Sequence, residues 1–172
     1  TNFIMHEILN RNCGGKAILL YSSFDDFFLS CYKNKQRTEW AQYIFSELKL
    51  AIKHRLKLDS IDTPDFKLPQ IAASLWLVQI AIFQSELQKN DNLQTLQSEV
   101  FFQNPEQVIS AALSFFGQSI SKEEVEAITG SDLFTSFSKN PAIPYNNEKR
   151  VEERKQITTM VEKDLQEARQ WA

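Results

Sequence analysis

The stretch AILLYSSFDDFFLSCYK, residues 17–33, decides how the first third of the chain folds. Two apolar runs of strand length flank the adjacent acids Asp25 and Asp26. This order predicts a β-hairpin with the two aspartates at its tip. A second interpretation begins a helix at Ser22 or Ser23, because a serine three residues before Asp26 is typical of a helix cap. Periodicity does not separate the two interpretations in so short a segment.

The overall composition is that of an ordinary folded protein. The 172 residues are 42% hydrophobic and 24% charged, which is enough for one domain or two small ones. Because the net charge is −3, only a local basic patch would attract nucleic acid. Two cysteines without metal-ligand spacing, no signal peptide and no apolar run of membrane-spanning length predict a cytoplasmic protein with no membrane partner.

Helical patterns dominate the rest of the chain. A helix is predicted from Thr38, with an apolar face that repeats every four residues: Trp40, Ile44, Leu48, Ile52 and Leu56. A second helix, residues 70–89, is apolar nearly all round and is expected to be buried. Further helices are predicted at residues 90–103, 104–117, 121–130, 131–140 and 147–172.

The last predicted helix carries a narrow apolar seam among charges of both signs. The seam consists of Val151, Thr158, Val161, Leu165 and Ala168. Such a seam docks on a partner helix or closes the chain's own bundle. The predicted fold is therefore mostly α, a helical bundle with a possible short β-hairpin or palm-like element near the N-terminus. We divide it into residues 1–66, the hairpin and an amphipathic helix, and residues 67–172, a helical bundle domain.

The segment LLYSSFDDFFLS, residues 19–30, resembles the palm motif of the polymerase-like large subunit of CRISPR effector complexes. In that family an apolar strand leads into Tyr-Ser-Gly-Gly-Asp-Asp, and a second apolar strand and an amphipathic helix follow. Tyr21, Ser22, Asp25 and Asp26 match this pattern. The similarity covers about the first third of the chain, and reverse transcriptases and nucleotide cyclases share part of the motif.

The sequence departs from the family pattern at its two glycines, which are Ser23 and Phe24 here. Glycine lets the backbone approach a phosphate closely, whereas the ring of Phe24 would occupy the place of the nucleotide. The resemblance thus implies a degenerate palm, in which Mg²⁺ would bind Asp25 and Asp26 only if the palm were active. Such a metal site needs a second carboxylate from a neighbouring strand, and nothing in the sequence plainly supplies it. The resemblance also implies a helical C-terminal domain, with protein subunits and RNA or single-stranded DNA as partners.

A cluster of cations precedes the helix predicted from Thr38 and continues along it. Three of its lysines recur every four residues, opposite much of the expected apolar face. Such a ridge can follow a phosphate backbone without reading bases, although an ordinary solvated helix face has the same pattern. Exposed Tyr32 or Tyr43 would favour binding. The candidate nucleic-acid-binding residues are Lys33, Lys35, Arg37, Lys49, Lys53, Arg55 and Lys57.

Three hypotheses of different classes follow from these patterns. The first is a non-enzymatic subunit or terminal domain of a nucleic-acid-handling, CRISPR effector-like complex. The second is a helical adaptor that binds only protein, through the seam around Val161 and Leu165. The third is a fragment of a Mg²⁺-dependent palm nucleotidyltransferase. No metal site is expected around His6 or His54, because neither has ligand residues at metal spacing.

Overall fold

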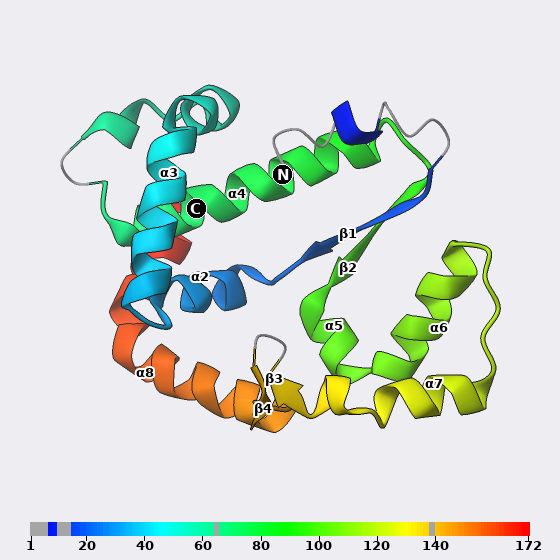
Figure 1. Cartoon of the computed structure of the whole chain (residues 1–172). Coiled ribbons are helices and arrows are strands. Elements are labelled where there is room, and N and C mark those ends of the chain that lie inside the picture. The colour runs from blue at the N-terminus through cyan, green and yellow to red at the C-terminus, as the bar shows by residue number, and fades with distance from the viewer. Residues whose placement is uncertain (1–6, 10–14, 64–65, 138–139) are drawn as a thin grey trace.

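The computed structural model describes residues 7–9, 15–63, 66–137 and 140–172. The fold is mostly α with a short strand element, as predicted (Figure 1). The helices are α2 (Phe24–Tyr32), α3 (Lys35–Leu56), α4 (Leu68–Leu87), α5 (Ser98–Gln103), α6 (Pro105–Phe115), α7 (Lys122–Thr129) and α8 (Asn147–Trp171). The strands are β1 (Ala17–Tyr21), β2 (Leu93–Gln97), β3 (Ser136–Phe137) and β4 (Asn140–Pro144), and 3₁₀ turns lie at Asp59–Asp62 and Asp132–Phe134.

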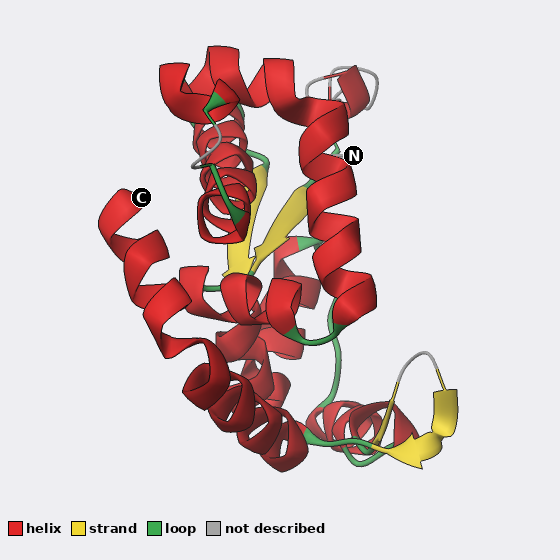
Figure 2. Ribbon diagram, turned by 90° about the vertical axis from the view of Figure 1, so that its left-hand side faces the viewer, coloured by secondary structure: helices red, strands yellow, loops and turns green. Residues whose placement is uncertain are grey.

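The strand element near the N-terminus is a parallel pair, so the predicted hairpin is wrong. β1 pairs with β2 from Ala17 opposite Leu93 to Tyr21 opposite Gln97. Figure 2 shows these two strands side by side with helices around them. Parallel strands need a long crossover connection, and here α2, α3 and α4 provide it.

The helical interpretation of the segment after Tyr21 is confirmed. Ser23 is the N-cap of α2, and its hydroxyl accepts a hydrogen bond from the backbone N–H of Asp26 at 3.1 Å. Asp25 and Asp26 lie in the first turn, where negative charge favours a helix. The helix buries Phe28 and Cys31 completely, and the buried thiol of Cys31 has its pKa raised to about 11.

Helix α3 begins three residues before the predicted start, and its predicted apolar face packs on the core except at Trp40. Its N-cap is Asn34, which accepts from the backbone N–H of Arg37 at 3.0 Å. The buried side chains are Ala41, Phe45 and Ile52. Trp40 is instead 38% exposed. It lies on the solvent side of the helix, with the guanidinium of Arg37 over its ring.

Helix α4 is the central core helix, as its apolar sequence predicts. Most of its first half is buried, including Ser74, whose hydroxyl donates to the carbonyl of Gln70 at 2.7 Å. By length and composition this helix could also cross a membrane, and half of it is buried inside the protein. One core cluster joins Leu19, Phe28 and Ile61 to Val78 and Leu165. Residues on both sides of the predicted boundary at 66/67 thus share a core, and that boundary stays a prediction.

Two further predicted helices differ from the structure. The first half of residues 90–103 is β2 and only the second half is helical, because pairing with β1 satisfies the backbone groups of Leu93–Gln97. Within residues 131–140, one 3₁₀ turn is followed by strands β3 and β4, which pair antiparallel. By contrast, α6 begins at Pro105 as predicted and is followed by Gly117, whose φ of 75° suits glycine.

Helices α5, α6 and α7 form an arm on the side of β1 and β2 away from α3 (Figure 1). Helix α6 has no buried residue. Helix α8 returns from this arm to the core and bends at Val161, whose φ/ψ of −123°/21° are not helical. Its seam packs into the chain's own core, where Leu165 and Ala168 are buried and Val161 is partly buried.

Candidate functional site

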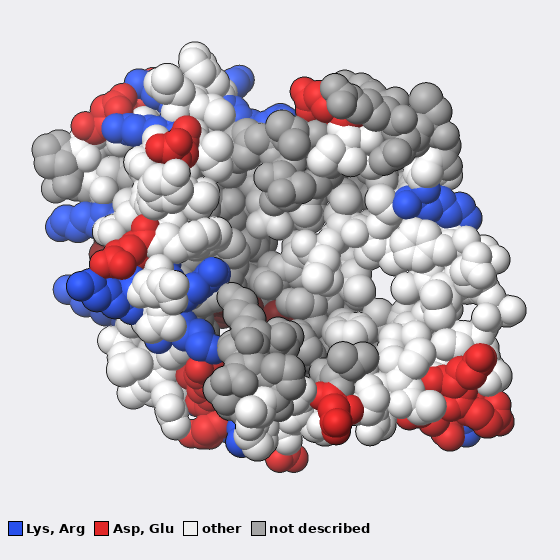
Figure 3. Space-filling view, in the orientation of Figure 1, with Lys and Arg blue, Asp and Glu red and all other residues white. Residues whose placement is uncertain are grey.

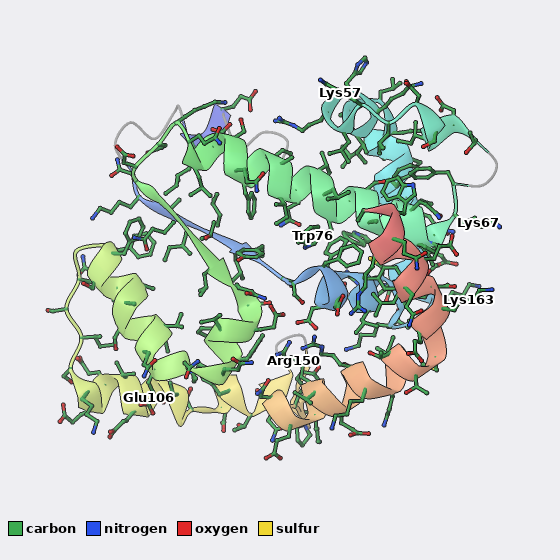
Figure 4. All side chains as sticks on the ribbon, turned by 180° about the vertical axis from the view of Figure 1, so that it is seen from behind. Lys57, Lys67, Trp76, Glu106, Arg150 and Lys163 are labelled. Atoms are coloured by element: carbon green, nitrogen blue, oxygen red, sulfur yellow. The ribbon has the colours of Figure 1, made fainter. Side chains whose placement is uncertain are left out.

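The carboxyl ends of β1 and β2 bring two serines and two helix starts together. Ser22 follows β1 and Ser98 follows β2, and their hydroxyl oxygens lie 3.2 Å apart. The carbonyl of Ser22 accepts a hydrogen bond from the indole N–H of Trp76 in α4 at 3.0 Å. In open sheets with parallel strands, this end is where ligands are bound. We therefore take this end of the sheet as the candidate site (Figure 4).

Asp25 and Asp26 contact different arginines of α8. Arg169 donates from Nε to Asp25 Oδ1 at 3.0 Å and also contacts Oδ2, whereas Asp26 is ion-paired with Arg154. Consecutive helical residues point about 100° apart, so the two carboxylates reach different parts of α8. Among the described residues, no group of three or more His, Cys, Asp or Glu side chains could hold a metal ion.

The second carboxylate beside Asp26 is Glu99, which the sequence analysis missed. Its Oε2 accepts from the backbone N–H of Ser23 at 3.2 Å, and its Oε1 accepts from the hydroxyl of Ser98 at 2.9 Å. Arg150 Nη1 lies 3.7 Å from Asp26 Oδ2 and 3.8 Å from Glu99 Oε1. The segment LQTLQ has no strict apolar–polar alternation, so nothing in the sequence indicated a strand that ends next to Glu99.

The environment drives the pKa values of the two carboxyls apart. Burial and the neighbouring Glu99 raise the pKa of Asp26 to about 6, although Arg154 and Arg150 oppose this shift. Burial alone would raise the pKa of Glu99, but hydrogen bonds from Asp26, Ser98 and the backbone hold it at about 2. A proton bound by the pair therefore lies on Asp26.

Further side-chain bonds tie α8 to the core on either side of its bend. Tyr32 donates from its hydroxyl to Asp164 Oδ2 at 2.9 Å, and the Lys33 ammonium lies 2.6 Å from Glu153 Oε2. Burial and the bond to Asp164 raise the pKa of Tyr32 far above its ordinary value. Lys33 thus contacts α8 and lies apart from the predicted lysine ridge. The ring of Tyr32 is not exposed, so it does not add to the case for nucleic-acid binding.

The structure brings only part of the predicted basic ridge together. Lys49 and Lys53 both pair with Asp62, at 2.7 and 2.8 Å. These two lysines hold the pKa of Asp62 at about 2. Arg55 and Lys57 are exposed near the end of α3 and have no ion-pair partner among the described residues.

Arg37 and Lys35 lie at the other end of α3. Arg37 stacks over Trp40, with its guanidinium carbon 4.4 Å from the ring centre, and Lys35 lies 3.7 Å from Glu39. His54 is exposed on the same helix. His6, the other histidine of the chain, lies outside the described residues.

Comparison with family models, curated proteins and solved structures gives no match for this chain. The resemblance to the CRISPR large subunit therefore stays a prediction. Its expected strand–turn–strand geometry is absent from residues 17–33, which form a strand and then a helix.

Proposed function

We propose that this chain is a non-enzymatic helical subunit or terminal domain of a nucleic-acid-handling complex, with α3 contacting the phosphate backbone. The observation that carries the proposal is the solvent face of α3, which carries two exposed aromatic rings as well as cations. Tyr43 is 60% exposed, and Trp40 is exposed beneath the guanidinium of Arg37. Rings on which bases can stack, beside cations that follow the backbone, are typical of sequence-tolerant binding to single strands.

The charge distribution favours the same face. Residues 33–57 contain seven Lys or Arg residues and two Glu, although the whole chain has a net charge of −3. Figure 3 shows most of the visible Lys and Arg on the left, around α3, with some Asp and Glu among them, whereas Asp and Glu dominate the lower right over α7. A polyanion would therefore meet α3 first and be repelled by the α7 end.

The site is expected to bind weakly and with strong salt dependence. Asp62 already neutralises part of the charge of Lys49 and Lys53, so a phosphate must compete with it. Arg55 and Lys57 are the cations that remain available near the same end of α3. Contacts of this kind fix the position of a strand without reading its sequence.

The experiment is fluorescence anisotropy with labelled single-stranded RNA, single-stranded DNA and duplex DNA at several salt concentrations. Simultaneous Lys49→Ala, Lys53→Ala and Lys57→Ala is expected to weaken binding at least about tenfold at low salt and to flatten the salt dependence. The matched control replaces three exposed lysines outside α3, Lys89, Lys122 and Lys155, and is expected to change little. Identical isotherms for the two triple variants would refute the proposal.

A protein adaptor is the second candidate, and the exposed arm favours it. The part of the α8 seam from Val161 to Ala168 packs into the chain's own core, so a partner would have to dock elsewhere. On the arm, Phe116 and Ile128 are exposed apolar side chains. This candidate predicts no nucleic-acid affinity at low salt. It also predicts that Phe116→Ser with Ile128→Ser abolishes co-purification of the subunits that accompany the unaltered chain.

A further inference from the structure

Two cavities adjoin at the place where α5 meets the start of α8. The larger, of about 490 Å³, is walled mainly by the rings of Phe101, Phe102, Phe134 and Tyr145. The smaller, of about 270 Å³, lies at the carboxyl ends of β1 and β2. They share Phe102, Tyr145 and Arg150, so one molecule could occupy both. The larger volume is typical of small-molecule sites.

The larger cavity has the chemistry of a slot for a flat ring. Phe101 contacts both Phe102 and Phe134, with ring centres 5.6 and 5.8 Å apart. The guanidinium of Arg150 lies 4.4 Å above the ring of Phe102 and donates from Nε to Asn147 Oδ1 at 3.2 Å. Aromatic walls with a few polar groups on one side suit a planar aromatic ligand.

The smaller cavity contains a buried carboxylate, Asp26, whose ion-pair partners are both arginines. The side chain of Asp26 is only 7% exposed, and neither of its oxygens accepts a hydrogen bond from a described residue. Arg154 and Arg150 already balance its charge. The adjacent Glu99, by contrast, accepts from Ser23 and Ser98. What Asp26 lacks is therefore a neutral donor such as a hydroxyl group.

We propose that the joined cavities bind a flat aromatic ring attached to a sugar, as in a nucleoside or an aryl glycoside. The ring occupies the larger cavity between Phe102 and Phe134, and sugar hydroxyls donate to Asp26 in the smaller one. Arg150 lies between the two parts, at the start of α8 (Figure 4). The lysines tested in the proposed function, Lys49, Lys53 and Lys57, line neither cavity, and the ligand needs no phosphate, so this inference does not rest on the proposed function.

The experiment is isothermal titration of the full chain with adenosine, uridine and 4-nitrophenyl β-D-glucoside as probes. At least one probe is expected to bind with a Kd below about 1 mM. Binding of adenosine or uridine indicates a nucleoside ligand, and binding of the glucoside indicates an aryl glycoside. Removing the hydroxyls tests the role of Asp26. Replacing adenosine or uridine by its 2′,3′-dideoxy form, or the glucoside by 4-nitrophenol, is expected to weaken binding about tenfold.

Two matched variants test the aromatic cavity. Phe134→Ala removes a wall and is expected to weaken binding at least about tenfold. Phe116→Ala removes an exposed ring that lines neither cavity and is expected to leave binding unchanged. The inference is overturned if no probe binds at about 5 mM, if the dideoxynucleoside or 4-nitrophenol binds as well as its parent probe, or if the two variants weaken binding equally.

Discussion

Asp26 and Arg154 form the ion pair that joins the first turn of α2 to the middle of α8. The preceding residue, Asp25, pairs with Arg169 instead, fifteen positions further along α8. Two adjacent carboxylates therefore fasten the last helix on either side of its bend at Val161. The pair that resembled a catalytic motif in the sequence serves to hold the bundle together.

The two ion pairs are expected to differ in their contribution to stability. Arg154→Ala leaves the buried Asp26 carboxylate with only Arg150, 3.7 Å away, and is expected to lower the free energy of unfolding by up to about 3 kcal/mol. Arg169→Ala breaks a pair whose partners are both well exposed, and we expect a loss under about 1 kcal/mol. Urea unfolding followed by circular dichroism measures both values. Equal losses for the two variants would contradict the assignment of the buried pair.

Asp26 is expected to make stability depend on pH in the mildly acidic range. Its pKa in the folded chain is about 6, above the ordinary 3.8, so the folded state binds a proton more tightly than the unfolded state. This contribution is complete below pH 3.8 and is lost as the pH rises through 6. The pKa of Glu99 is lowered from 4.5 to about 2. Its contribution to stability is therefore complete above pH 4.5 and is lost as the pH falls toward 2.

The comparison with Asp26→Asn isolates this effect. Between pH 7 and pH 4 the unaltered chain is expected to gain about 1–2 kcal/mol over the variant, less than the full pKa shift implies because solvent screens part of it. Unfolding in urea at each pH gives the difference. A gap between the two proteins that stays constant with pH would show that Asp26 does not titrate there.

Asp62 is expected to restrain nucleic-acid binding by α3. Asp62→Asn removes the charge that both Lys49 and Lys53 contact, so both ammonium groups become available to phosphate. We expect tighter binding in the anisotropy assay and a steeper loss of affinity with salt, because more counterions are released. Asp59→Asn, on the same 3₁₀ turn but in no ion pair with these lysines, serves as the control. Unchanged affinity in Asp62→Asn would argue against contact between these lysines and nucleic acid.

The register of β1 gives a prediction about two adjacent leucines. Leu19 is buried in the core, whereas Leu20 is largely exposed, because successive strand residues face opposite ways. Leu19→Ala is expected to cost about 3 kcal/mol and Leu20→Ala less than about 0.5 kcal/mol of unfolding free energy. Thermal unfolding of the two variants checks the register, and the reverse order would mean that β1 is shifted by one residue.

Local signals in the sequence determined most of the helices. Ser23 as the cap of α2, Pro105 at the start of α6 and Ser121 with Glu124 at the start of α7 are short-range patterns that the structure retains. Their hydrogen bonds join residues three or four positions apart, so they can be predicted without knowledge of the fold. The concentration of cations on residues 33–57 is likewise visible in the sequence.

Only the tertiary structure decided which residues form the site. Glu99 reaches Ser23 across 76 positions of the chain, and Arg169 reaches Asp25 across 144. The strand at Leu93–Gln97 exists because β1 supplies its hydrogen-bond partners, and a five-residue segment has too weak a preference of its own to be identified alone. Contacts of such separation depend on how whole helices pack, which short-range patterns do not encode.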